Sequence, residues 1–295
     1  MKRPTLFLTL MFSGFSPALA QMPATTGAVP ITITARQGVD WSQQSQTITA
    51  NGNAKAVRGT VTVTADQLVA HYTKKASTPA KASPNAQAPA QGSSQLTQLD
   101  AIGNVHIYTA TDNAWGDKAV YSIGQQILVL TGKNLKLTTP NDVLTARDSI
   151  EYNAAMHQAV ARGNARIVAT DGRSIAADVI IGYFAPPTNK TTSHSATQPA
   201  PGQNMLDASG NLQRVEALGH VVIITKDNTV TGNRGVYLPP SGKARLGGDV
   251  HIIHGANRLS GSDALVNMKT NTATMIAVPG EQVSGVVVPE SGKKQ

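Results

Sequence analysis

Gly103-Asn104-Val105-His106-Ile107 is the stretch that decides the fold, because close copies of it recur along the 295-residue chain. Each copy opens with a glycine and a residue that can adopt positive φ, so we expect a turn there. In most copies the next three residues alternate apolar, polar, apolar, which is the period of a β-strand. The other copies begin at Gly52, Gly163, Gly219 and Gly248, and a weaker one begins at Gly132.

The spacing of these glycines predicts a repeat array. Successive glycines are separated by 51, 29, 31, 56 and 29 residues. The two long gaps also shrink to about 30 residues once an insertion of roughly 20 to 25 residues is removed from each. Residues 76–95 and 185–204 supply those insertions, since both are low in complexity and should be disordered loops. A period near 30 indicates a solenoid-like stack in which each unit packs on its neighbours.

A second series, built around an aspartate, alternates with the first. It is clearest at Gly116-Asp117-Lys118-Ala119-Val120-Tyr121, and other copies place an aspartate at positions 66, 148, 178 and 263. One aspartate per repeat in equal register indicates a turn or strand-terminus role, whereas glycoside hydrolysis needs one unique carboxylate pair. We therefore predict no catalytic residue and no enzyme.

Alternation also predicts which side chains point inward. In the glycine series the second and fourth residues, such as Val105 and Ile107, are apolar, whereas the third, such as His106, is mostly polar. The first set should form an apolar interior and the second should face water. In the aspartate series, the residue two places after each aspartate, such as Ile150, is assigned to the interior as well.

The first 20 residues indicate export from the cytoplasm. Lys2 and Arg3 provide positive charge, residues 5–15 are apolar, and Ala18-Leu19-Ala20 is a small-x-small cleavage site. We expect residues 1–20 to be a cleaved signal peptide and the mature chain to be periplasmic. Cleavage removes two cations and no acid, so the net charge falls from +8 to +6. A positive charge suits a polyanionic partner such as a phosphorylated glycolipid or a membrane surface, and nucleic acid is not expected there.

The composition limits how the interior can be built. The chain has no Cys, and Phe184 is the one Phe outside the signal peptide. Val, Ile, Leu and Ala must therefore fill the interior, either as a thin packed core or around a cavity that another molecule occupies. The seven His give no metal motif, because His251 and His254 would lie on opposite faces of a strand. His106 and His251 occupy equivalent outward positions, so we predict surface histidines, no metal and no cofactor.

Two blocks of sequence are familiar. Trp41 followed by residues 46–54 and 63–68, and then Ala114–Tyr121 with Leu128-Val129-Leu130-Thr131-Gly132, resembles the OstA-like family of LptA-type lipopolysaccharide carriers. The similarity runs from about residue 31 to residue 278 apart from the two loops. The predicted organisation is a signal peptide (1–20), an OstA-like β-jellyroll repeat domain (31–278, interrupted by loops 76–95 and 185–204) and a C-terminal tail (279–295).

The resemblance implies an all-β fold, a V-shaped stack of short antiparallel strands. It also implies a carrier that shelters the acyl chains of lipid A in its groove. Its implied partners are lipopolysaccharide, an LptC-like inner-membrane protein, an LptD-like outer-membrane protein and further copies joined end to end. An apolar groove with few aromatic rings suits fatty chains on physical grounds. The residues predicted to face lipid are Leu68, Val105, Ile107, Ile150, Ile167, Ile180, Val221, Ile223, Val250, Ile252 and Leu265.

Two other functions fit the sequence less well. One is a structural scaffold of the cell envelope that binds no lipid. The other is a β-solenoid enzyme that acts on carbohydrate, which would use some of the repeated aspartates.

Overall fold

Every regular element of the structure is a β-strand. The computed structural model describes residues 31–74, 94–186, 212–277 and 280–288. The strands are β1 (Thr32–Thr34), β2 (Gly38–Ser42), β3 (Thr47–Arg58), β4 (Val61–Lys74), β5 (Ser94–Tyr108), β6 (Asn113–Ser122), β7 (Ile127–Thr131), β8 (Leu135–Thr138), β9 (Asp142–Ala146), β10 (Ser149–Asn153), β11 (Gln158–Ala169), β12 (Ser174–Phe184), β13 (Leu212–Ile224), β14 (Thr229–Leu238), β15 (Lys243–His254), β16 (Asn257–Asn267), β17 (Thr272–Ile276) and β18 (Ser284–Val286). The predicted all-β class is confirmed. Within the described ranges, no helix is long and apolar enough to cross a membrane.

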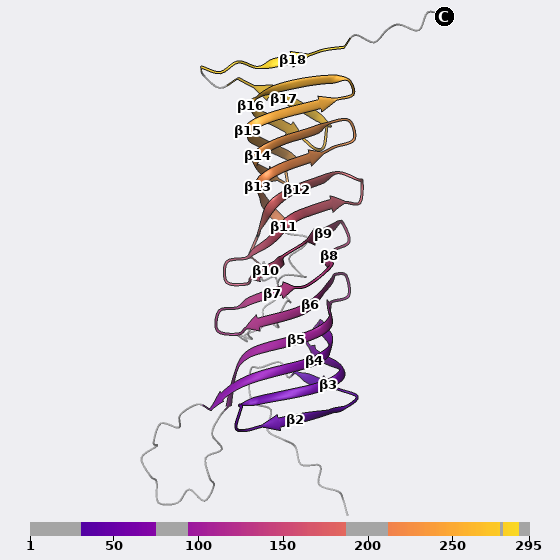
Figure 1. Ribbon diagram of the computed structural model, residues 1–295, viewed down its shortest axis with the longest axis vertical. Helices are drawn as coiled ribbons and strands as arrows, with labels where there is room; N and C mark the ends of the chain where they lie inside the picture. The colour runs from indigo at the N-terminus through magenta and orange to yellow at the C-terminus, as the bar shows by residue number, and fades with distance from the viewer. Residues whose placement is uncertain (1–30, 75–93, 187–211, 278–279, 289–295) are drawn as a thin grey trace, which may run out of the picture.

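The strands stack in chain order along one axis. All of those described join a single sheet, and their pairings are antiparallel. Figure 1 shows the stack rising from β2 at the bottom to β18 at the top, so the two ends of the described chain lie at opposite ends of the molecule. This order follows from the repeat, because each strand finds its partner in the neighbouring segment of the sequence.

The long strands each contribute to two ladders. In β6, residues 118–122 pair with β7, whereas residues 113–115 pair with β8. Further up the stack β7 pairs with β10, and β8 pairs with β9. We call wall A the ladder that contains β2, β7, β10 and β17, and wall B the ladder that contains β1, β8, β9 and β18. Each long strand gives one segment to each wall.

The recurring glycine pairs mark the boundary between the walls. Gly103 has a φ of 76° and Asn104 a φ of 47°, and the pairing of β5 with β6 shifts register at this point. The pair is therefore a β-bulge inside a strand, and our prediction of a turn between strands was wrong at these positions. The sequence correctly indicates two positive-φ residues, but the chain continues in the same direction into the other wall. The copies at Gly52, Gly163, Gly219 and Gly248 have the same positive φ pair.

Three of the repeated aspartates, Asp66, Asp148 and Asp178, lie against these bulges. A Cβ atom on Gly103 would stand 2.2 Å from Oδ2 of Asp66, which accepts a hydrogen bond from Asn104 Nδ2 at 2.9 Å. Asp178 stands in the same relation to Gly219. The aspartate of one strand thus packs where the next strand has no side chain. Its role in the fold is to hold the bulge, which explains its equal register in the repeats.

The two walls face each other across one hydrophobic core. Leu130 and Ile150 of wall A belong to the same buried cluster as Val105 and Ile223 of wall B. The sheet therefore bends along the column of bulges and encloses a V-shaped interior, as the predicted fold class requires.

The domain boundaries differ in small ways from the predicted ones. Ser94 and Gln95, assigned to the first loop, are the first residues of β5 and pair with β4. β18 lies in the segment assigned to the tail, and it pairs with β16. The predicted signal peptide and most of both predicted loops lie outside the described residues.

Candidate lipid-binding interior

The inner face of wall A is a continuous row of mostly small apolar residues. Cross-strand partners connect its members, so that Leu68 lies opposite Ala101 and Ala101 lies opposite Ala119. In order up the stack the row is Ala50, Leu68, Ala101, Ala119, Leu130, Ile150, Ala161, Ile180, Ala217, Gly235, Leu246 and Ala264, and all are buried. More than half of these residues are Ala or Gly, whereas a second inner row on the same wall carries larger side chains, among them Tyr121, Leu128 and Tyr152.

Wall B presents a bulkier row to the same interior. Ile107 lies opposite Ala114, and Ile167 lies opposite both Leu144 and Ile175. The row is Ala56, Val63, Ile107, Ala114, Leu137, Leu144, Ile167, Ile175, Ile223, Val230, Ile252 and Leu259, and each member is buried in the core or packed against it. Wall B also carries small inner residues next to the bulges, such as Ala54, Ala165 and Ala177, so both walls combine small and larger side chains.

Ten of the eleven residues predicted to face lipid point into this interior. Leu68, Ile150 and Ile180 belong to the row on wall A. Val105, Ile107, Ile167, Val221, Ile223, Val250 and Ile252 belong to wall B. The bulges turn the two segments of each long strand so that both sets face the same interior.

Leu265 is the exception, and its predicted inward position was wrong. Its side chain is 48% exposed and lies opposite Arg245 on the outer face, whereas the flanking Ala264 and Val266 are buried. The chain of cross-strand partners through the sheet places Asp263 level with Lys118. Asp263 is therefore not the structural equivalent of Asp117. A slip of one residue moves a side chain to the opposite face of a strand. Alignment on Gly261 instead of Asp263 would have placed Ala264 correctly.

The interior contains two apolar chambers. The first has a volume of about 720 Å³, part of it open to solvent, and it is lined by Leu68, Ile107 and residues of β1, β3 and β7. The second has about 650 Å³ and is lined by Ile167, Ile180 and Phe184 together with residues of β8 and β9. Both chambers use side chains from the two walls, so the space between the walls is where an apolar ligand would fit.

Aromatic rings that the sequence analysis did not single out separate the chambers. Tyr121 lines the first chamber, and Tyr152 lies two strands further up the same wall, edge-on to Phe184 at 6.2 Å between ring centroids. Burial raises the pKa of Tyr152 to about 12, and no hydrogen-bond partner of its hydroxyl lies among the described residues. Burial also raises the pKa of Tyr121, which the charge of Arg58 partly offsets. Both rings therefore remain neutral.

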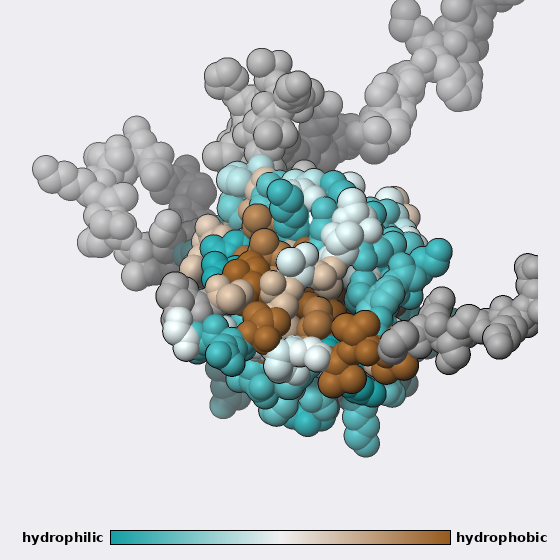
Figure 2. Space-filling model, turned by 90° about the horizontal axis from the view of Figure 1, so that it is seen from above, coloured by the Kyte–Doolittle hydropathy of each residue, from teal (hydrophilic) through white to brown (hydrophobic). Residues whose placement is uncertain are grey.

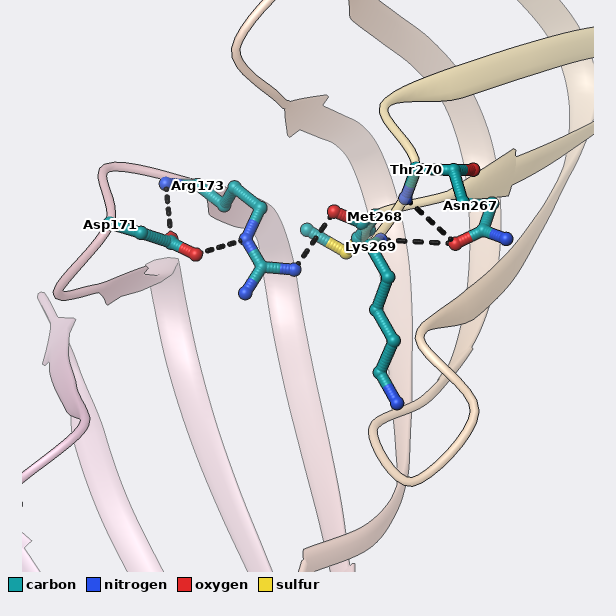
Figure 3. A network of polar contacts seen from close by, with 6 residues as sticks. All are labelled: Asp171, Arg173, Asn267, Met268, Lys269 and Thr270. Atoms are coloured by element: carbon teal, nitrogen blue, oxygen red, sulfur yellow. Dashed lines mark hydrogen bonds and ion pairs between the residues drawn. The ribbon is translucent and has the colours of Figure 1, made fainter.

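Polar contacts cross the opening of the V beside the second chamber. Figure 3 shows Arg173, in the turn after β11, reaching Met268, in the turn after β16. Arg173 Nη1 donates to the Met268 carbonyl at 3.0 Å, while its Nε donates to Asp171 Oδ2 at 2.6 Å. A second bridge runs from Asn228 Nδ2 to the Asn271 carbonyl at 2.8 Å. These bonds tie the free edge of wall B to the free edge of wall A.

Ionisable groups around this bridge differ in their environments. Burial raises the pKa of Asp142, which lines both the second chamber and the polar space next to it. Burial also acts to raise the pKa of Asp171, but hydrogen bonds from the backbone and guanidinium of Arg173 hold it below its ordinary value. Asp171 is therefore the anion that orients Arg173.

The histidines lie at the surface or at the free edge of wall B. His106 and His251 both face outward from wall B, and His251 Nε2 is 3.2 Å from Asp249. His254 Nδ1 is 3.1 Å from Asn228 Oδ1 at the free edge. In the described part of the chain, no three His, Asp or Glu side chains gather into a group that could hold a metal ion.

Both ends of the stack expose apolar residues. At the N-terminal end, Val39 and Trp41 lie on the inner side of β2 and are mostly exposed. Viewed from the C-terminal end, apolar residues gather in the middle of the face, and hydrophilic residues surround them (Figure 2). The interior therefore reaches the surface at each end of the described stack.

The fold and its interior define the class of this protein as an open antiparallel β-jellyroll whose two walls enclose an apolar trough. Residues 32–155 match the family described as "LptA/(LptD N-terminal domain) LPS transport protein". This match confirms, over residues 32–155, the resemblance to OstA-like domains stated from the sequence.

Comparison with solved structures and curated proteins adds the following. One similar structure is LptH of Pseudomonas aeruginosa, described as the LptA-homologous periplasmic component of the lipopolysaccharide transport device. It has 14% sequence identity and a TM-score of 0.38, and the match covers 50% of this chain and 95% of LptH. No curated protein matches the sequence.

Proposed function

We propose that this protein is a periplasmic, non-enzymatic carrier of lipopolysaccharide that shelters lipid A acyl chains between its two walls. The proposal depends on one observation, the continuous inner rows of wall A and wall B. These rows offer hydrocarbon contacts along the whole described stack. The family match over residues 32–155 supports the same role. The eleven predicted residues, less Leu265, are the proposed lipid contacts.

The driving force for this binding is burial of the acyl chains. Each CH₂ group that leaves water contributes about 0.8 kcal/mol, so a few chains are enough without specific contacts. The small inner residues of both walls leave room beside the larger ones, and the two chambers provide the first space. An aliphatic interior without fixed polar partners also favours reversible binding, which transfer between carriers requires.

The sheet ends are the proposed contacts with partner proteins. Strands at the ends of a sheet carry unpaired backbone groups that can accept a further strand. An LptC-like partner, an LptD-like partner or a second copy of this chain could add to β1 and β2 at one end or to β17 and β18 at the other. The apolar interior would then continue from one molecule into the next.

Photocrosslinking from neighbouring residues tests the lipid contacts. A photoreactive amino acid replaces Ile107 or Ile167, which point inward, and in controls it replaces Lys118 or Lys243, which lie on the outer face of wall A. After expression in cells that make lipopolysaccharide, we expect labelled lipid from Ile107 and Ile167 only. Labelling from the outer positions alone would show that the interior is not the lipid site.

Depletion of the protein tests the transport role itself. We expect newly made lipopolysaccharide to disappear from the cell surface and to accumulate at the inner membrane. Normal surface delivery would leave a structural scaffold as the better explanation. Loss of polysaccharide hydrolysis in an Asp148→Asn variant would instead point to the enzyme.

A further inference from the structure

The outer face of wall B carries cations and no carboxylate. Side chains alternate along each strand, so the residues between the buried ones face outward. In the described part of the chain, these outward positions hold the cations Lys55, Lys136, Arg166 and Arg258 but no Asp or Glu. Most of the remaining positions hold Thr, Ser, Val or Ile.

The outer face of wall A differs in its charge pattern. Several of its cations stand beside acids, as in the pair of Arg162 with Glu151 at 3.1 Å and the pair of Arg245 with Asp263 at 2.9 Å. On wall B, by contrast, Lys136 lies 5.5 Å from the centroid of the Trp115 ring, and Arg166 Nη2 donates to a serine hydroxyl. The bulge residue Asp249 pairs with His251 and not with these cations, so Lys136 and Arg166 contribute positive charge to the face.

The same face also carries aromatic and aliphatic side chains. Trp115 stacks on His106 with 4.9 Å between ring centroids, and His106 stacks on Tyr108 at 4.6 Å. Towards the C-terminal end, Ile224 and Ile253 face outward and are half-buried. Rings with an apolar body and a polar edge are enriched where lipid meets water.

We propose that the outer face of wall B docks onto an anionic lipid surface. Lys55, Lys136 and Arg166 contact headgroup phosphates, and Trp115 lies at the level of the headgroups. The sheet face is extended, and its half-buried aliphatic residues would lose their remaining contact with water only against lipid. A soluble polyanion would leave them in water. The face lies on the opposite side of wall B from the interior, so docking leaves the trough free.

Sedimentation with lipid vesicles tests this docking. The full chain is mixed with vesicles of phosphatidylcholine alone or mixed equally with phosphatidylglycerol. The test variant is Lys136→Glu with Arg166→Glu on wall B, and the control is Lys118→Glu with Lys243→Glu on the outer face of wall A. Both variants change the net charge equally. We expect the wall B variant to bind anionic vesicles at least about tenfold more weakly, and the control to bind like the parent.

Three outcomes would overturn the proposal. Equal weakening in both variants would show that net charge, and not this face, drives binding. Failure of the parent protein to bind anionic vesicles would exclude a lipid surface. Displacement by soluble polyphosphate as effective as by vesicles at equal phosphate would identify a soluble polyanion. The test uses no lipopolysaccharide, so its failure leaves the proposed carrier function standing.

Fluorescence gives an independent readout. The chain has two Trp residues, so in a Trp41→Phe variant Trp115 is the sole reporter. We expect its emission to shift to shorter wavelength when anionic vesicles are added. Sedimentation with vesicles but no shift would mean that another face makes the contact.

Discussion

The two chambers are built by the same walls and differ at the free edges of those walls. Around the second chamber, Arg173 and Asn228 bond across the opening, and Asp142 places a carboxyl group at its rim. The first chamber is lined mainly by aliphatic residues of β1, β3, β4 and β5, together with Tyr121, Arg58 and Asp100. The strands thus determine how apolar the trough is, whereas the turns determine how its opening is held. The predictions below test this division.

The largest loss of stability is expected from a substitution between the two chambers. Ile150 is fully buried and lines neither chamber, whereas Ile107 already borders the first one. Ile150→Ala should lower the free energy of unfolding by about 3–5 kcal/mol, and Ile107→Ala by about 2–3 kcal/mol, because existing space reduces the new cavity. Urea denaturation measures both. Equal losses of unfolding free energy would mean that side chains repack to fill the first chamber, so that it offers no existing space.

The bulges should be equally sensitive at both chambers. Gly103 and Gly219 both have a φ of 76°, and a Cβ atom on either would stand 2.2 Å from an aspartate oxygen. Gly103→Ala and Gly219→Ala should each cost about 3 kcal/mol from strain and overlap. The matched control is Gly172→Ala, since Gly172 also has positive φ but nothing within 4 Å of an added Cβ. A control as destabilised as the two variants would rule out a contribution from the aspartates.

The bridge should stabilise only the second chamber. Arg173→Ala removes a hydrogen bond across the opening and should lower the free energy of unfolding by about 1–2 kcal/mol. Limited proteolysis should then cut the turns after β11 and β16 faster. Arg147→Ala is the control, because Arg147 pairs with Asp148 at the exposed bulge column, and we expect almost no change. Faster cutting in the control would argue against a local role for Arg173.

The smallest effect concerns pH. The pKa of Asp171 is lowered in the folded state, so its contribution is present above the ordinary carboxyl pKa of 3.8 and is lost as the pH falls below that value. Because the pair is exposed, Asp171→Asn should cost only about 0.2–1 kcal/mol at neutral pH. Thermal unfolding of the two proteins should converge in acid. A difference that grows as the pH falls would have the wrong sign.

The strand faces could be predicted from the sequence, because period-two alternation is a local signal that burial enforces. Val105, Ile223 and Ile252 show this. The bulge at Gly103 was read as a turn because positive φ is common to both, and only the partner strand decides between them. The prediction for Leu265 was wrong because a shift of one residue in register moves a side chain to the opposite face of the strand. The contact of Arg173 with Met268 joins residues 95 positions apart. The sequence around neither residue contains a pattern that predicts it.

The bulge column has a consequence for the size of the molecule. The bend between the walls is made at the two bulge residues of every second long strand, so the cross-section does not depend on how many strands are stacked. If a whole repeat of two long strands were duplicated or removed, the trough would change in length by about 10 Å, and its width would stay the same. The number of repeats thus determines the distance that one molecule can span.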